Sequence, residues 1–117
     1  MVEKIKNIVV FVRDFQAART FYREALGLPP GQETEMMMEF FPGSGTQLGV
    51  ALALHDAAQK LVGRHTGITL NVKGLEEFCA RLTEKGARFT EPLEKTPWGK
   101  MAVVADPDGN EFALVES

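Results

Sequence analysis

The same order of predicted elements occurs twice in this sequence, about 60 residues apart. Residues 5–12 (IKNIVVFV) are rich in Ile and Val, as β-strands are, and residues 66–72 (TGITLNV) have a similar character. A shift of 60 residues aligns IVVFV with ITLNV. The halves share order and spacing, while few residues are identical. The repeat predicts one structural unit used twice within a single domain of 117 residues, with module one at about 1–60 and module two at about 61–117.

Each first strand is followed by a predicted helix. Asp14 can cap the first helix, and Gly27 ends it. The second helix stops at Gly86. The apolar residues at helical spacing are Phe15, Ala18, Phe21, Tyr22 and Ala25 in the first helix, and Leu75, Phe78, Cys79 and Leu82 in the second. Three extended segments follow each helix, near 32–36, 37–41 and 47–54, and near 88–91, 100–105 and 111–116. Each half is therefore predicted to be a βαβββ unit.

Composition and charge exclude several classes of protein. The chain has 13 basic and 16 acidic residues, and its net charge of −3 is too mild for a nucleic-acid surface. No apolar run approaches the ~18 residues of a membrane span, and the N-terminal MVEKIKN lacks a signal-peptide core. The single cysteine, Cys79, excludes an internal disulfide. We therefore expect a cytoplasmic protein with neither a nucleic-acid nor a membrane partner.

Alternation along the two first strands assigns their faces. Ile8, Val10 and Val12 share one face, as do Ile68, Leu70 and Val72, and these aliphatic faces are expected to lie under the helices. The opposite faces carry Asn7, Val9 and Phe11, and Gly67, Thr69 and Asn71. Such mixed faces suit the wall of a binding cleft, although a water-facing antiparallel sheet gives the same alternation.

Three segments carry a family resemblance. They are IKNIVVFVRDFQAARTFYREALGL at 5–28, GITLNVKGLEEFCARLTEKGA at 67–87 and PWGKMAVVADPDGNEFALVE at 97–116. In this order they resemble the vicinal oxygen chelate superfamily, which includes glyoxalase I, extradiol dioxygenases and bleomycin-resistance proteins. The resemblance implies an α+β fold, with two tandem βαβββ modules forming a curved mixed sheet around a cleft. It also implies a homodimer.

The resemblance also allows a test for the metal site of this superfamily. Metal-dependent relatives use four His or Glu side chains, two from each module. Here the matching positions are Asn7, Gly67, Ala113 and, in the stretch VALALH, Leu52. None of these four side chains is a normal ligand for a divalent metal. We therefore expect neither a metal nor another cofactor. The two histidines, His55 and His65, are expected to be exposed near strand ends.

A cleft without a metal still has candidate wall residues. The predicted ligand contacts are Asn7, Phe11, Met38, Phe40, Thr69, Asn71, Trp98, Met101 and Ala113. Within MMMEFF, alternation leaves two choices open, with either Met36, Met38 and Phe40 or Met37, Glu39 and Phe41 facing inward. Methionine and aromatic residues make adaptable apolar walls, but the same residues also build ordinary cores. Trp98 could stack on a flat ligand or pack structurally.

One acidic residue is a weak catalytic candidate. If Glu39 faces an apolar cavity, desolvation would raise its pKa and make it a possible general base. The opposite parity would leave it exposed to solvent. Cys79 is expected to be a buried small hydrophobic residue, and the acids of DPDGN at 106–110 are expected to shape a turn.

Two functional hypotheses follow. In the first, the protein binds a small, partly apolar molecule without a metal in a cleft of a homodimer. In the second, it is a lyase or dioxygenase-type enzyme of the same superfamily, with a displaced metal site or metal-free acid–base chemistry. A third reading is a dimerisation domain whose cleft its own side chains fill. The identity of the ligand does not follow from the sequence.

Overall fold

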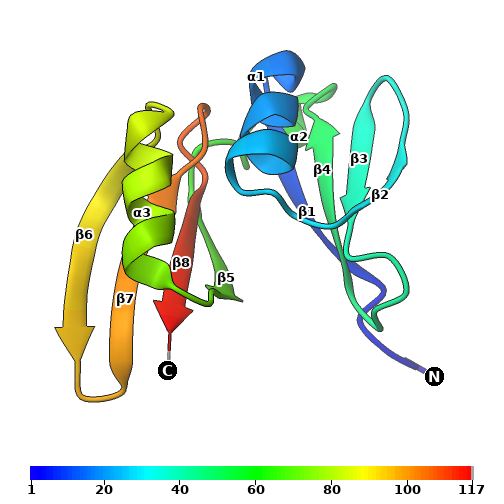
Figure 1. The fold of residues 1–117 in the computed structure, drawn as a ribbon. Coiled ribbons are helices and arrows are strands. Elements are labelled where there is room, and N and C mark those ends of the chain that lie inside the picture. Colours follow the sequence, from blue (N-terminus) through cyan, green and yellow to red (C-terminus); the bar gives the residue numbers. More distant parts are fainter. Residues whose placement is uncertain (117) are drawn as a thin grey trace. The chain divides into compact units, whose positions relative to one another are not determined.

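Two four-stranded mixed β-sheets, each with a helix on one face, make up the fold (Figure 1). The structure is a computed structural model, and it describes residues 1–116. Contacts between residues divide the chain into two compact units, Met1–Val62 (unit 1) and the segment from Gly63 onward (unit 2). This division lies close to the boundary predicted near residue 60. The predicted α+β class and the two tandem modules are confirmed, although the strands form two sheets instead of one.

Unit 1 follows the predicted βαβββ order with one addition. Its elements are β1 (Asn7–Val12), α1 (Phe15–Arg19), η1 (Thr20–Ala25), β2 (Pro30–Glu33), β3 (Met37–Phe40), β4 (Gln47–Leu52) and α2 (Asp56–Gln59). The strand order across the sheet is β1-β4-β3-β2, with β1 parallel to β4 and the other pairs antiparallel. The short helix α2, which the sequence analysis did not predict, has no buried residue.

The helical segment of unit 1 begins and ends where the sequence predicts. The Asp14 carboxylate accepts a hydrogen bond of 3.0 Å from the Ala17 backbone N–H, which caps α1. The second half, η1, is π-helical, and the Leu26 N–H donates to the carbonyl of Phe21, five residues earlier. Gly27 then adopts a φ of 65°, a left-handed conformation that ends the helix.

The core of unit 1 lies between α1/η1 and one face of its sheet. Tyr22 is fully buried, and its ring centroid lies 6.1 Å from that of Phe40 in β3. Strand pairing places Phe40 beside Leu48 and Met38 beside Val50, which in turn pairs with Val10. All of these side chains are buried. The helix side of the sheet is therefore the face of Val10 and Val12, as alternation predicts.

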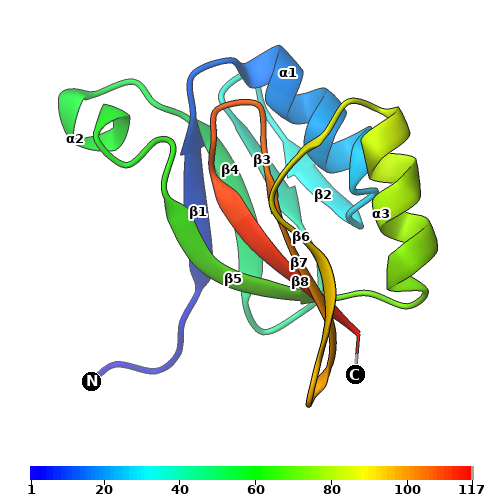
Figure 2. The same cartoon turned by 90° about the vertical axis from the view of Figure 1, so that its left-hand side faces the viewer.

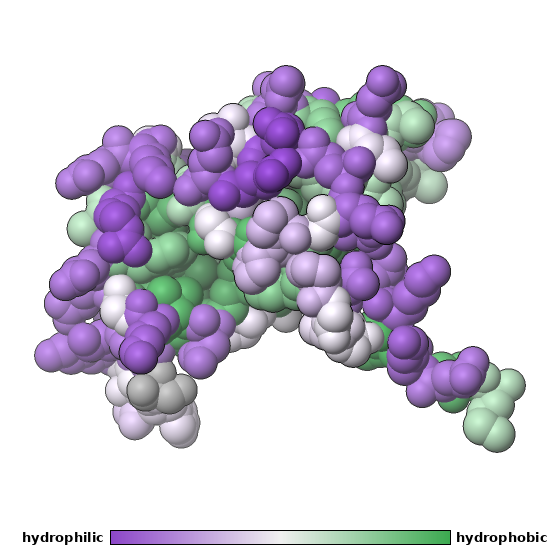
Figure 3. All heavy atoms as spheres, turned by 45° about the vertical axis from the view of Figure 1, so that its right-hand side comes forward, coloured by the Kyte–Doolittle hydropathy of each residue, from purple (hydrophilic) through white to green (hydrophobic). Residues whose placement is uncertain are grey.

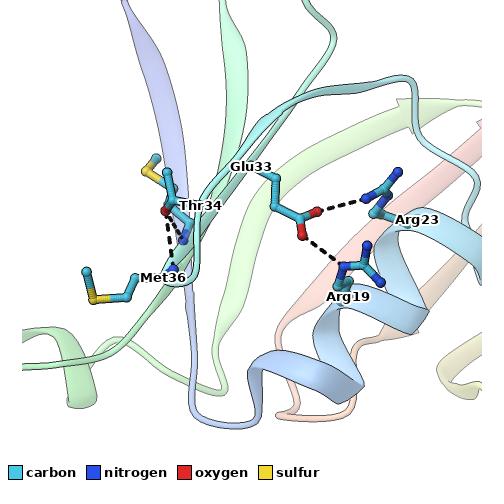
Figure 4. A network of polar contacts seen from close by, with 6 residues as sticks. Arg19, Arg23, Glu33, Thr34 and Met36 are labelled. Carbon is cyan, nitrogen blue, oxygen red and sulfur yellow. Dashed lines mark hydrogen bonds and ion pairs between the residues drawn. The ribbon is translucent and has the colours of Figure 1, made fainter.

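A pair of arginines holds β2 against the helical segment. Arg19 Nε and Arg23 Nη1 each lie 2.9 Å from a different carboxylate oxygen of Glu33, as Figure 4 shows. The hydrogen bond from Arg19 is the main cause that holds the pKa of Glu33 below its ordinary value. Thr34 Oγ1 then accepts hydrogen bonds from the N–H groups of Met36 and Met37. This turn sets the start of β3.

Unit 2 repeats the plan of unit 1. Its elements are β5 (His65–Asn71), α3 (Leu75–Glu84), β6 (Arg88–Thr96), β7 (Gly99–Ala105) and β8 (Glu111–Glu116), in the sheet order β5-β8-β7-β6. β5 is parallel to β8, as β1 is to β4. β6 is longer than the predicted segment 88–91. Its pairing with β7 shifts between Glu91 and Glu94, so Pro92 lies in an irregular part of an edge strand, where proline is tolerated.

The carboxylate of Glu116 caps helix α3. The residue before α3, Gly74, is left-handed and supplies no side-chain cap. Instead, Glu116 from the end of β8 accepts hydrogen bonds from the N–H groups of Gly74 (2.9 Å) and Leu75 (3.0 Å). Helix α3 lies against one face of this sheet, and its buried residues are Leu75, Cys79 and Leu82 (Figure 2). Because Glu116 reaches α3, the residues Leu114 and Phe112 at the same parity of β8 also face the helix.

The segment DPDGN forms the predicted turn between β7 and β8. Asp106 Oδ1 accepts hydrogen bonds from the backbone N–H groups of Asp108 (2.9 Å) and Asn110 (2.8 Å). The Asn110 side-chain carbonyl accepts from the Gly63 N–H at 2.9 Å. Asp106 and Asn110 are the buried polar residues of the described chain, and both have partners. The turn therefore also fixes the segment that enters β5.

Hydrophilic side chains predominate on the face drawn in Figure 3, with hydrophobic residues visible between them. Several large apolar side chains are exposed, including Trp98 at 85% and Met36 at 51%. Within residues 1–116, no helix has the length and apolar character that crossing a membrane requires.

Two neighbouring methionines test the assignment of faces in unit 1. Met38 is 1% exposed on the helix side, whereas Met37 is partly exposed on the other side of β3. We expect Met38→Ala to lower the free energy of unfolding by about 2–5 kcal/mol, the range for large-to-small core substitutions. Met37→Ala should cost less than half as much. Urea denaturation of both variants measures the difference, and equal losses would contradict the assignment.

The Glu116 cap should make stability depend on pH. Hydrogen bonds from Gly74 and Leu75 hold the pKa of Glu116 below its ordinary value. A lowered folded-state pKa stabilises the protein above the unfolded-state pKa, and this contribution disappears as pH falls through the folded-state value. We expect Glu116→Gln to lower the melting temperature by a few degrees at pH 7, and to lower it by less as the pH falls through the lowered pKa of Glu116. Glu84→Gln, at the other end of α3, is the matched control and should not lower it.

Candidate functional site

In unit 1, the face of the sheet opposite α1 and η1 gathers polar and small residues. We call it the distal face of unit 1. Strand register aligns the residues of this face in three rows across β1, β4 and β3. The rows are Asn7 and Gln47; Val9, Gly49 and Glu39; and Phe11, Ala51 and Met37. Two predicted contact residues, Asn7 and Phe11, therefore share this face. The sequence did not predict that Gln47, Gly49 and Ala51 lie on this face. The alternation of β4 indicates them only once its pairing with β1 is known.

Gly49 lies at the centre of this face, in the strand between β1 and β3. A methyl group at Gly49 would lie 3.5 Å from Val9 Cγ2 and only 2.6 Å from the terminal Cε of Met37. The end of the Met37 side chain therefore lies directly over the Gly49 backbone. A glycine inside a strand lets another group approach the backbone closely, and here that group is the thioether of Met37.

The polar groups on the same face are two amides and one carboxylate. Asn7 and Gln47 are neighbours across the parallel pair β1–β4 and are both partly exposed. Glu39 pairs with Gly49 across β3–β4 and is also partly exposed. The structure thus selects the parity that puts Met37 and Glu39 on the distal face. The amides can donate and accept hydrogen bonds, and the carboxylate can accept them or move a proton.

The prediction that Met38 and Phe40 contact a ligand is wrong for this arrangement. Both side chains are 1% exposed and lie on the helix side of the sheet, in the core with Tyr22. Alternation alone allowed either parity for MMMEFF. Pairing with the buried Leu48 and Val50 decides it, because a strand puts alternate residues on opposite faces.

Phe41 departs from this alternation. It is the only non-glycine residue of the described chain with a positive φ, at 62°. Its N–H donates to the carbonyl of Pro29 at 2.8 Å, and its carbonyl accepts from the Ser44 N–H and hydroxyl. A left-handed conformation costs a residue with a side chain about 1–2 kcal/mol. These hydrogen bonds hold Phe41 in the turn that ends β3, so its face cannot be assigned by strand parity.

Unit 2 has its own distal face, opposite α3. Register places Thr69 beside Ala113 and Val103, and Asn71 beside Val115 and Met101. Four predicted contacts, Thr69, Asn71, Met101 and Ala113, therefore share one face. Thr69 and Asn71 are exposed, whereas Ala113 and Val103 are 8% and 6% exposed. This face combines a polar edge with an apolar centre.

The remaining candidates lie off these faces. Trp98 is 85% exposed in the turn between β6 and β7, and its backbone N–H donates to Thr96 Oγ1. His65 is exposed at the start of β5, with Nδ1 3.6 Å from Glu111 Oε1. His55 is exposed just before α2. Cys79 is buried in α3, and burial raises the pKa of its thiol. As predicted, Cys79 is a small core residue.

The sheet register also revises one of the four positions tested for metal ligands. Leu52 pairs with the fully buried Val12, so it does not share the face of Asn7. Val9 pairs with Gly49 just as Thr69 pairs with Ala113, and residues 9 and 69 are related by the 60-residue repeat. Gly49 is therefore the counterpart of Ala113, and the assignment to Leu52 was wrong.

The four positions, so revised, do not fit a metal. Asn7, Gly49, Gly67 and Ala113 offer one amide and no carboxylate, imidazole or thiolate. An amide oxygen alone is a poor ligand for a catalytic divalent ion, which needs several converging donors. Within residues 1–116, no group of three or more His, Cys, Asp or Glu side chains could hold a metal ion. The side chains at these four positions therefore do not supply the ligand set of a divalent metal.

Comparisons with solved structures give matches over the whole chain. A member of the glyoxalase/bleomycin resistance protein/dioxygenase superfamily from Sphaerobacter thermophilus DSM 20745 is 32% identical. Its structure matches with a TM-score of 0.79, covering 100% of this chain and 99% of that one. TnmS3, an antibiotic binding protein from Streptomyces sp. CB03234, is 27% identical with a TM-score of 0.75, covering 98% and 96%. Sequence comparison also finds the uncharacterized protein YetH of Bacillus subtilis (strain 168). It is 24% identical over 123 residues, which cover 99% of this chain and 100% of YetH.

The model of the glyoxalase/bleomycin resistance protein/dioxygenase superfamily matches residues 4–114. That range includes both βαβββ units and every strand but the end of β8. The chain therefore belongs to the glyoxalase/bleomycin resistance protein/dioxygenase superfamily.

Proposed function

We propose that this protein binds a small, partly apolar molecule without a metal, on the distal faces of its sheets. The observation that carries the proposal is the set of residues at the four positions where metal-dependent relatives have ligands. Asn7, Gly49, Gly67 and Ala113 replace charged or imidazole side chains by one amide and three small groups. These residues do not supply the metal donors of those relatives.

The chemistry of the two faces suits such a ligand. The central strands β4 and β8 carry small residues on these faces, Gly49 and Ala51 in unit 1 and Ala113 in unit 2. On the distal face of unit 1, Val9 and Phe11 supply apolar contact, and Asn7 and Gln47 supply hydrogen-bonding groups. On the distal face of unit 2, Met101 supplies apolar contact, and Thr69 and Asn71 supply hydrogen-bonding groups. A largely apolar surface with a few fixed polar groups is the usual composition of small-molecule sites.

One relative supports the same class of function. TnmS3 is an antibiotic binding protein, and this chain is 27% identical to it over nearly its full length. We infer an antibiotic-like molecule as the ligand class, a compound with an apolar ring system and hydrogen-bonding substituents. We also propose that the protein acts as a homodimer, on the basis of the resemblance of its sequence to dimeric members of the superfamily.

The binding proposal predicts a ligand effect that does not depend on metal. A library of natural-product antibiotics is screened by thermal shift on protein treated with EDTA. A ligand at 100 times its Kd should stabilise the protein by about 2.7 kcal/mol. Elemental analysis of untreated protein should find metal far below one equivalent. Near-stoichiometric Ni, Zn, Mn or Fe, with stabilisation lost after EDTA, would contradict the proposal.

Asn7 should contribute a hydrogen bond to the bound molecule. One neutral hydrogen bond is worth about 0.5–1.5 kcal/mol, so Asn7→Ala should weaken the best screening hit by about 2- to 13-fold. Gln16→Ala is the matched control, because Gln16 is exposed on α1, away from this face. Isothermal titration calorimetry measures both. Equal affinity of the wild-type protein and Asn7→Ala would remove Asn7 from the site.

A second function is metal-free acid–base catalysis through Glu39. The specific observation is its place on the distal face of unit 1, beside Gly49 and on the same face as Asn7. If a screening hit is chemically converted, Glu39→Gln should reduce kcat by about 100-fold or more, the usual contribution of a general base. Glu35→Gln, two residues before β3, is the control. Conversion at an unchanged rate in Glu39→Gln would exclude this role.

A further inference from the structure

Met37 covers Gly49, a position on the distal face of unit 1 where the sheet has no side chain. Its Cε lies 2.6 Å from where a Cβ of residue 49 would stand, so the methyl group occupies the space of that missing side chain. Gly49 is buried, although a glycine contributes no side chain of its own to the core. The cover over its backbone on this face includes the Met37 thioether and Val9.

The backbone of Met37 is held firmly, while its side chain can move. The Met37 carbonyl accepts a hydrogen bond of 2.8 Å from the Thr34 N–H, and its own N–H donates to Thr34 Oγ1 at 3.1 Å. Pairing with Ala51 fixes its register in the sheet. Figure 4 shows the Thr34 contact at the start of β3. The side chain beyond this anchor is unbranched and partly exposed, so it can change rotamer without disturbing the strand.

Leucine and isoleucine have less rotational freedom than methionine, and β-branched residues are favoured in strands. Neither residue carries an atom at the Cε position, which in Met37 covers Gly49. Methionine instead offers a polarizable sulfur that makes favourable contacts with aromatic rings. The Gly49 backbone has no side chain, and the Met37 thioether above it can move, so a planar ligand can enter between the two.

We propose that Met37 is a specificity-determining residue, whose thioether moves off Gly49 to admit a planar aromatic ring and then packs against the edge of that ring. The ring lies over the Gly49 and Ala51 backbone, and a polar substituent reaches the Asn7 and Gln47 amides. This inference rests on the proposed function and deepens it by naming the ligand class as planar aromatic. Saturated or strongly bent molecules would not fit between the thioether and the strand.

The test follows the methionine methyl groups while acridine, a planar three-ring probe, is titrated into the protein at pH 8. The chain contains five methionines, Met1, Met36, Met37, Met38 and Met101, so labelling with methyl-¹³C methionine gives a simple spectrum. Single Met→Leu variants assign the signals. Ring currents should shift the Met37 methyl signal in a saturable way. The Met38 signal is the internal control, because Met38 lies next in sequence but on the helix side of the strand.

Affinity supplies a second measurement on the same protein. Met37→Leu conserves volume and should fold, but it removes the sulfur and stiffens the side chain. The Kd for acridine should rise by about 2- to 10-fold, as expected for the loss of a sulfur–aromatic contact. Met36→Leu, at an exposed neighbouring position, should leave the Kd unchanged. Circular dichroism of each variant confirms that it is folded.

The outcomes separate this inference from the proposed function. A saturable Met37 shift together with the weaker binding of Met37→Leu supports the role of Met37. Saturable binding of acridine with an unmoved Met37 signal and an unchanged Kd for Met37→Leu overturns that role and leaves the binding function standing. No binding of acridine, while the antibiotic screen gives hits, overturns the planar aromatic class alone. No binding of any compound in either experiment overturns the proposed function as well.

Discussion

The parallel pairing of the first strand with the last strand of each unit is the constraint on which the rest of the structure depends. β1 cannot pair with β4 until the chain has crossed through α1, η1, β2 and β3, and β5 reaches β8 in the same way. A parallel pair requires such a long crossover, and the helix within it covers one face of the sheet. The other face is left to strand residues alone. In each unit, this pairing therefore creates both a core and a candidate binding surface.

Strand alternation then separates the residues that build the fold from those that give the distal face its chemistry. Asn110, just before β8, binds Gly63. Within β8, Phe112 and Leu114 fill the core and Glu116 caps α3. The positions between them, Ala113 and Val115, lie on the distal face. β1 has the same division, with Val10 and Val12 in the core and Asn7 and Phe11 opposite. Residues on the distal positions can change with little effect on the packing beneath the helices.

This division explains which parts of the structure the sequence could predict. The aliphatic runs, the Asp14 cap and the terminal glycines Gly27 and Gly86 act locally, so they predicted the order of elements and the end of each helix. The parity of MMMEFF and the partner of Asn7 depend on register between strands far apart in the sequence. The assignments of Met38, Phe40 and Leu52 failed for that reason. β6 was predicted too short because Pro92 resembles a strand end unless the bulge around it is known.

A glycine at a central position of a strand need not leave a hole in such a sheet. Where Gly49 has no side chain, the neighbouring Met37 reaches across the diagonal of the strand pair and fills the space. At the equivalent position of unit 2, Ala113 retains a small side chain and is 8% exposed. The two units thus fill the equivalent position in different ways, unit 1 with the end of the Met37 side chain and unit 2 with the methyl group of Ala113. The side chains at this position of the two distal faces therefore differ even though the backbone plan is repeated.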